Sequence, residues 1–201
     1  MRRTLTTIGI VALVGASSLA AQVTLTPTYN APYRAFSRSE FGVLLSFPSG
    51  GDVAIEGAYR MASGRLDLGF KGGVFLPGGG ADAVFLAGVE GRQRVITHST
   101  DFPLDGAVIV GVGGNFASGA SVMIIPVGLS LGRRLNLERS TVSIVPYVQP
   151  TFFILAGDVV DNTAFALGLG ADFRLSPRFD GRFSAGLGDV EGVSLGFVWL
   201  H

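Results

Sequence analysis

Apolar and polar residues alternate with a period of two along most of the chain, most clearly in its last stretch. From Val193 to Trp199 every second residue is large and apolar, whereas Ser194 and Gly196 lie between them. A period of two is that of a β-strand whose two faces meet different surroundings. No apolar pattern of helical period competes with it over a long window. The chain is therefore predicted to be all-β.

Ten stretches with this alternation are separated by clusters of glycine, asparagine, aspartate and serine, which favour turns. The predicted strands are 36–47, 52–61, 66–74, 83–89, 104–115, 120–131, 140–155, 162–175, 179–188 and 190–200. Short turns favour pairing between consecutive strands. The predicted fold is an antiparallel up-and-down β-barrel of ten strands, with eight strands as the alternative. An even number of strands places both ends of the barrel domain on one side, and the loops at 48–51, 77–82, 116–119, 157–161 and 188–192 on the other.

Three prolines fall within the predicted strands. Pro126, Pro146 and Pro150 lack the N–H group that a strand donates to its neighbour, and a closed barrel has no free edge for them. Bulges or bends are the expected accommodation. Alternatively, one of these segments is broken in two, which would change the strand count.

The N-terminal stretch has the features of a secretory signal. Arg2 and Arg3 precede an apolar run at 8–14 and small residues at 18–21. The apolar run is shorter than the roughly 20 residues that a membrane-spanning helix needs. We therefore predict a signal peptide at 1–21, a polar lead-in segment at 22–35 and a barrel domain at 36–201.

Composition favours a membrane over water as the surroundings of the apolar face. Charged residues make up 15% of the chain, and Lys71 is the only lysine. An ordinary soluble protein has about 25% charged residues. The formal net charge is zero, which argues against a nucleic-acid partner. The predicted barrel is therefore a transmembrane one, with a soluble exported ligand-binding barrel as the alternative.

Charged residues collect on the face opposite the apolar one. Neighbours of opposite sign, such as Glu56 and Arg60, are two or four residues apart and therefore on the same side of a strand. The interior of a barrel of about eight strands is just filled by side chains, so these charges are expected to pair inside a filled lumen. The predicted lumen charge network consists of Arg38, Glu40, Glu56, Arg60, Asp67, Lys71, Glu90, Arg92, Asp172, Arg174 and Arg182.

The leader, the alternating strands and the aromatic last strand resemble those of small bacterial outer-membrane β-barrel proteins. The resemblance covers residue 36 to the end and identifies no subfamily. It implies a bacterial outer-membrane location, contact with outer-membrane lipid, and assembly by the barrel-assembly machinery through the C-terminal strand with Leu195, Phe197 and Trp199. Leu200 and His201 follow the last aromatic residue.

Catalytic, metal and cofactor sites are not predicted. His98, Ser99 and Asp101 lie close together and include residue types that a lipid hydrolase or acyltransferase uses. Adjacent positions in a loop do not make a triad, however, because a triad needs a base held against the nucleophile by a third group. The predicted topology also places this loop on the periplasmic side. Asp158 and Asp161 lie outside any twelve-residue calcium loop.

The predicted function is a structural, adhesive or envelope-maintenance role of a closed outer-membrane barrel. The alternative from another class is a porin-like narrow channel for small solutes or apolar compounds.

Overall fold

The computed structural model describes residues 23–32, 38–49, 52–137, 142–158 and 161–201. The strands are β1 (Glu40–Pro48), β2 (Val53–Ser63), β3 (Leu66–Leu76), β4 (Val84–Ile96), β5 (Asp105–Ala117), β6 (Ala120–Gly132), β7 (Leu135–Asn136), β8 (Ser143–Gly157), β9 (Asp161–Arg174), β10 (Phe179–Gly188) and β11 (Gly192–Leu200). One short 3₁₀ turn, η1 (Gly78–Gly80), precedes β4. No helix in the described ranges is long and apolar enough to span a membrane.

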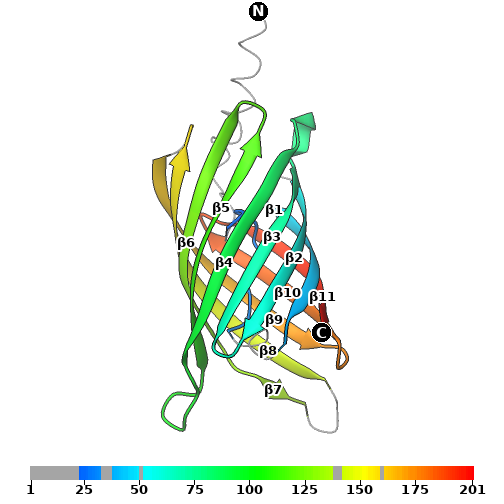
Figure 1. The fold of residues 1–201 in the computed structure, drawn as a ribbon, viewed down its shortest axis with the longest axis vertical. Coiled ribbons are helices and arrows are strands. Elements are labelled where there is room, and N and C mark those ends of the chain that lie inside the picture. Colours follow the sequence, from blue (N-terminus) through cyan, green and yellow to red (C-terminus); the bar gives the residue numbers. More distant parts are fainter. Residues whose placement is uncertain (1–22, 33–37, 50–51, 138–141, 159–160) are drawn as a thin grey trace, which may run out of the picture.

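The sheet closes on itself as a barrel (Figure 1). Strands β1 to β6 pair in chain order, β6 pairs with β8, β8 to β11 pair in order, and β11 returns to β1. The closing pair runs the full length of β1, from Glu40 opposite Leu200 to Pro48 opposite Gly192. Strand β7 has only two residues and pairs only with β8, so the barrel itself is closed by the ten longer strands. The prediction of ten antiparallel up-and-down strands is confirmed.

The two ends of the barrel are named here after β1. The Glu40 end is the end at which β1 begins and β11 finishes. The Pro48 end is the opposite end, and it carries the connections β1–β2, β3–β4, β5–β6, β8–β9 and β10–β11. Two connections are two-residue hairpin turns, and each has a glycine with positive φ: Gly64 at 63° and Gly119 at 84°. Glycine adopts this backbone conformation without a steric penalty.

The prolines cause neither a shift in register nor a break in their strands, so the predicted bulge and the alternative of a broken strand were wrong. β8 continues through Pro146 and Pro150 as one strand of 15 residues. Strand pairing is instead skipped at two prolines. β5 and β6 keep their register but lack two consecutive pairs, at Pro126 and Ile125, and β6 and β8 lack two, at Pro150 and Gln149. The missing N–H groups are therefore accommodated by local gaps in the ladder, and the strand count stays at ten.

Large apolar side chains cover the outside of the barrel. They protrude from every long strand, with 70% of Phe197, 65% of Phe85 and 63% of Phe152 exposed. Other members of this outer belt are Phe41, Ile55, Phe70, Val110, Met123, Phe165, Phe183, Leu195 and Trp199. The inward parity holds the charged residues instead, with Glu56 and Asp172 only 1% exposed. This is the facing of a transmembrane barrel, and it excludes an apolar core surrounded by a charged, wet surface.

Candidate functional site

Residues 23–32, here named the lumen segment, lie inside the barrel (Figure 1). All ten are buried. Val23 lies against Gly88 of β4 and Gly113 of β5, nearer the Pro48 end, and Pro32 lies against Gly132, the last residue of β6 at the Glu40 end. The described part of the predicted lead-in segment therefore runs lengthwise through the lumen.

Alternate threonines of the lumen segment bind charged side chains of the wall. The hydroxyl groups of Thr24 and Thr26 donate to the two carboxylate oxygens of Glu56, at 2.7 and 2.6 Å. The Lys71 ammonium donates to the Thr28 hydroxyl. These hydroxyls take the place of water around ions that are buried, because a buried charge without hydrogen-bond partners is strongly unfavourable.

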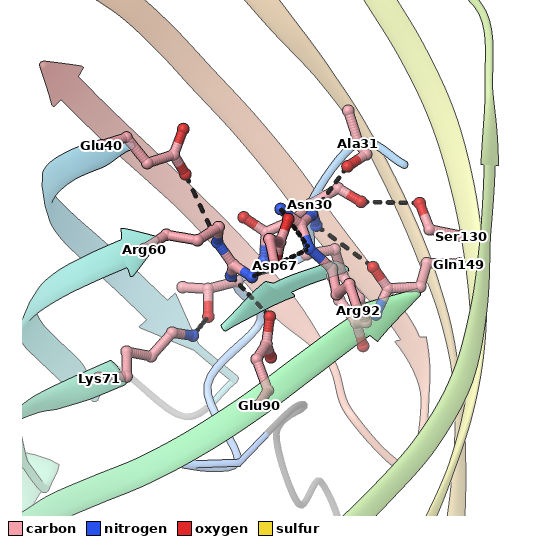
Figure 2. A network of polar contacts seen from close by, with 12 residues as sticks. Asn30, Ala31, Glu40, Arg60, Asp67, Lys71, Glu90, Arg92, Ser130 and Gln149 are labelled. Carbon is pink, nitrogen blue, oxygen red and sulfur yellow. Dashed lines mark hydrogen bonds and ion pairs between the residues drawn. The ribbon is translucent and has the colours of Figure 1, made fainter. Parts of the chain in front are cut away.

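The backbone of the lumen segment is bound along its second half. Ser184 accepts a hydrogen bond from the N–H of Tyr29 and donates one to the carbonyl of Pro27. Tyr147 donates to the Tyr29 carbonyl at 2.7 Å. At the next two residues, Asn30 bonds Gln149 and Ser130 through its backbone, and the carbonyl of Ala31 accepts from Arg92 at 2.8 Å (Figure 2). Wall side chains thus satisfy backbone groups that have no strand partner.

Glycines on the inner wall make room for the segment. A Cβ atom on Gly113 would lie 2.0 Å from the carbonyl oxygen of Val23, and one on Gly88 would lie 2.6 Å from the Cβ of Val23. On β9, a Cβ atom on Gly168 would lie 2.1 Å from the ring of Tyr29. No residue other than glycine fits at these positions unless the lumen segment shifts.

An apolar cluster packs on the other side of the segment. Leu25 and Tyr29 contact side chains of β6 and β8, including Ile124 and Phe153, both fully buried. The lumen is therefore divided between a charged side and an apolar side. A cavity of about 20 Å³ lies between Asn30, Glu40, Arg60 and Arg182, which is room for about one water molecule.

Arg60 is the centre of the charged side (Figure 2). Its guanidinium group lies 2.8 Å from Asp67, 2.6 Å from Glu90 and 3.5 Å from Glu40. The three carboxylates come from three strands, β3, β4 and β1, and Arg60 from a fourth, β2. One cation therefore connects four neighbouring strands across the lumen.

Two more arginines extend this network around the barrel. Arg92 donates to both carboxylate oxygens of Asp67, at 3.0 Å to Oδ1 and 2.7 Å to Oδ2. Arg182 makes a two-pronged contact with Glu40 at 2.8 and 2.6 Å, and its Nε lies 3.4 Å from Asp172. Asp67 and Arg92 face each other on adjacent strands, as do Asp172 and Arg182. The contact between Arg182 on β10 and Glu40 on β1 instead passes over the strand between them, β11.

Comparison with known proteins finds no matching family model and no matching curated protein. Among solved structures, a designed transmembrane β-barrel has a TM-score of 0.42 and 15% identity, covering 86% of this chain and 98% of its own. The β domain of the Bordetella autotransporter BrkA has a TM-score of 0.44 and 11% identity, covering 81% of this chain and 97% of its own.

The chain is a small β-barrel of the outer-membrane type. This assignment follows from the closed ten-stranded sheet, the apolar outer belt and the charged lumen.

Most of the predicted network residues lie inside this barrel. Glu40, Asp67, Glu90 and Arg92 are 3% exposed or less, and Glu56, Arg60, Lys71, Asp172 and Arg182 also face the lumen. Glu56 and Lys71 bind threonines of the lumen segment rather than their predicted neighbours Arg60 and Asp67. Arg174 is half-buried and pairs with Asp180 at 3.7 Å.

Arg38 does not belong to the lumen network, so this part of the prediction was wrong. It precedes β1 and is exposed at the Glu40 end, where it donates to the carbonyl of Pro177. The predicted strand 36–47 includes Arg38, which lies two residues before β1 begins at Glu40. Conversely, sequence reasoning missed Asp180, which is 1% exposed and shares its inward parity with Arg182.

The loop with His98, Ser99 and Asp101 is not arranged as a triad. His98 contacts Asp105 through Nδ1 at 2.9 Å. The Ser99 hydroxyl accepts a hydrogen bond from the backbone N–H of Phe102 within a turn. Asp158 at the other end of the barrel is bonded to Ser121. No group of three metal-ligating carboxylates or imidazoles occurs in the part of the chain that the structure describes.

Proposed function

We propose that this protein is a closed, non-conducting barrel of the bacterial outer membrane, with a structural role in the cell envelope. The observation that supports this best is the occupation of the lumen by residues 23–32. The apolar outer belt suits lipid, and the pattern at 1–21 is that of an export signal, which lies outside the described residues.

Ion flow through this lumen would have to displace bound groups. Among the described residues, the cavity beside Arg60 holds about 20 Å³, which is room for about one water molecule. The lumen segment has wall contacts over its whole length, from Val23 at Gly88 to Pro32 at Gly132. A channel would therefore require that the segment leave, which breaks the bonds to Glu56, Lys71, Ser184 and Arg92 together.

Conductance in planar bilayers tests the closed state. The purified full-length protein is expected to give no steady unit currents. A matched variant is Tyr29→Gly, which removes the ring that packs on Gly168 and in the apolar cluster, and it should raise the frequency of brief openings. Steady unit currents from the unaltered protein would favour the porin-like channel instead.

Location in the membrane is tested separately by gel mobility. A folded transmembrane barrel migrates differently in detergent before and after boiling, and fractionation of cells should recover the protein with outer membranes. A soluble periplasmic fraction without a mobility shift would contradict the proposed location.

The C-terminal strand is proposed to be the segment that the assembly machinery binds. Leu195, Phe197 and Trp199 protrude from the outer face of β11, which pairs with β1 to close the barrel. Phe197→Ser should slow appearance of the folded band in cells, whereas Ser194→Ala, on the inner face, should not. Equal assembly rates of the two variants would contradict this role.

A further inference from the structure

The two ends of the barrel carry opposite charge. The five connections at the Pro48 end contain no lysine or arginine, and their carboxylates are Asp52, Asp82, Asp158, Asp189 and Glu191 among the described side chains. At the Glu40 end, four exposed arginines occur in the described residues: Arg38, Arg65, Arg133 and Arg178. The one exposed acidic side chain described at that end is Asp101.

The exposed arginines are not used to hold the fold through ion pairs. Arg94 and Arg174 at the same end are half-buried, and each pairs with an aspartate, Asp105 and Asp180. In contrast, Arg38 and Arg133 donate to backbone carbonyl groups, and none of the four exposed arginines has an ion pair within the described ranges. Their charge is therefore available to an anionic ligand.

Two of them share an open pocket of about 450 Å³ at the edge of the outer belt. It is lined by Arg38, Arg178, Trp199, Leu200 and His201. The Trp199 ring packs edge-on against Phe179, with centroids 4.6 Å apart, and His201 stacks with Tyr59. Tryptophan and tyrosine of transmembrane proteins gather where the hydrocarbon meets the headgroups, so the pocket lies at headgroup height.

We propose that this pocket binds the phosphate of an anionic phospholipid in the leaflet at the Glu40 end of the barrel. The guanidinium groups of Arg38 and Arg178 supply charge and donors that match a phosphate, the imidazole of His201 adds polar surface, and Trp199 contacts the upper acyl chain. The five connections at the acidic Pro48 end contain no arginine or lysine that could bind a phosphate. The inference rests on the membrane location proposed above and adds a specific lipid class.

Lipid retention by the full-length protein tests this proposal. The protein is folded into vesicles of equal parts phosphatidylglycerol and phosphatidylcholine, extracted into mild detergent, and its bound lipids are counted by native mass spectrometry. Phosphatidylglycerol is expected to be enriched over phosphatidylcholine. Arg38→Gln with Arg178→Gln should reduce its retention about fivefold or more, whereas Arg65→Gln with Arg133→Gln, at the same end, should change it less than twofold.

Controls separate the sources of the effect. Inorganic phosphate at millimolar concentration should not displace the lipid, because it lacks acyl chains to contact Trp199; displacement would show a free-anion site and overturn the lipid assignment. Equal retention by both double variants, or equal retention of the two lipids, would also overturn it. Gel mobility before boiling checks that each variant is folded, and failure of every variant to enter vesicles would contradict the proposed membrane location itself.

Discussion

The outer belt and the lumen are built from the same ten strands but are specified in different ways. On the outer belt, Phe41, Phe85 and Phe197 are each more than half exposed, so another large apolar side chain could replace any of them. In the lumen, Arg60 and Glu56 each have defined partners at 2.6 to 2.8 Å. The outer face therefore needs only an apolar residue at every second position, whereas the lumen needs particular pairs of polar side chains. Substitutions at the two faces should differ accordingly.

The largest effect is expected at the centre of the charged side of the lumen. Arg60→Met leaves three carboxylates, Asp67, Glu90 and Glu40, buried near one another without their shared cation. Breaking a buried ion pair by removing one partner costs about 3 to 5 kcal/mol. Urea unfolding in vesicles, followed by the fluorescence of the single tryptophan Trp199, measures this loss. Arg65→Met, at an exposed turn, is the control and should lose little.

A charge placed on the outer belt should have the next largest effect. Phe183 is 42% exposed on the outer face of β10, and Phe183→Arg should cost about 2 to 4 kcal/mol if it lies near the middle of the bilayer. Phe183→Leu keeps the position apolar and should be nearly neutral in the same unfolding experiment. Equal stability of the two variants would mean that this face does not meet hydrocarbon.

Ser184, the inward neighbour of Phe183, is not a suitable comparison for Phe183→Arg. Parity alone predicts that Ser184→Arg is better tolerated than Phe183→Arg, because an inward arginine would meet a polar lumen. The structure places the Ser184 hydroxyl between the Tyr29 N–H and the Pro27 carbonyl. An arginine has no room there while the lumen segment is bound, so this comparison is replaced by Phe183→Leu.

Removing the threonine hydroxyls should have an intermediate effect. Thr24→Val with Thr26→Val keeps the shape of both side chains but leaves the Glu56 carboxylate without its two donors. Each hydrogen bond to a charged group contributes about 1.5 to 3 kcal/mol, so each of the two substitutions made alone should lose about that much, and the double variant should lose more. Adding Glu56→Gln should restore part of the stability, since a neutral amide is easier to bury; no recovery would contradict the assigned contact.

The smallest effect is expected for the ion pair at the rim. His98 is exposed and contacts Asp105, which Arg94 also binds at 3.0 Å. Exposed pairs contribute about 0 to 1 kcal/mol, so His98→Ala should change the midpoint of urea unfolding only slightly. A loss as large as that of Arg60→Met would mean that the rim is as tightly specified as the lumen.

Much of the fold could be predicted from the sequence because strand parity is a local property. The alternation around Trp199 and around Glu56 is visible in a few residues, and it correctly separates the outer belt from the lumen. Glycine and proline turns mark the strand ends for the same reason. Parity fails where a strand ends, as at Arg38, which follows the inward parity but lies outside β1. It also fails to distinguish the two faces of β8, where the inward residue Phe153 is as apolar as its outward neighbour Phe152.

The contents of the lumen could not be predicted in the same way. A lead-in of ten residues has no strand partner, and its place depends on contacts more than 100 residues away, such as Asn30 with Gln149 and Tyr29 with Ser184. Two signals were present: Thr24, Thr26 and Thr28 alternate with less polar residues, and the wall has inward glycines such as Gly113 that no charged neighbour fills. Sequence reasoning attributed that space to charged side chains of neighbouring strands.

The presence of the lumen segment inside the barrel is tested most directly by a disulfide between Val23→Cys and Gly88→Cys. The chain has no cysteine of its own, and the two Cβ atoms would start 2.6 Å apart, so a shift of about 1 Å reaches the usual Cβ separation of a disulfide. Val23→Cys with Ala87→Cys is the matched control, since Ala87 is exposed on the outer face of the same strand. Near-complete crosslinking of the first pair on mild oxidation, with little in the control, is predicted for the folded protein. Equal, low yields from both pairs would contradict a lumen closed by its own N-terminal segment.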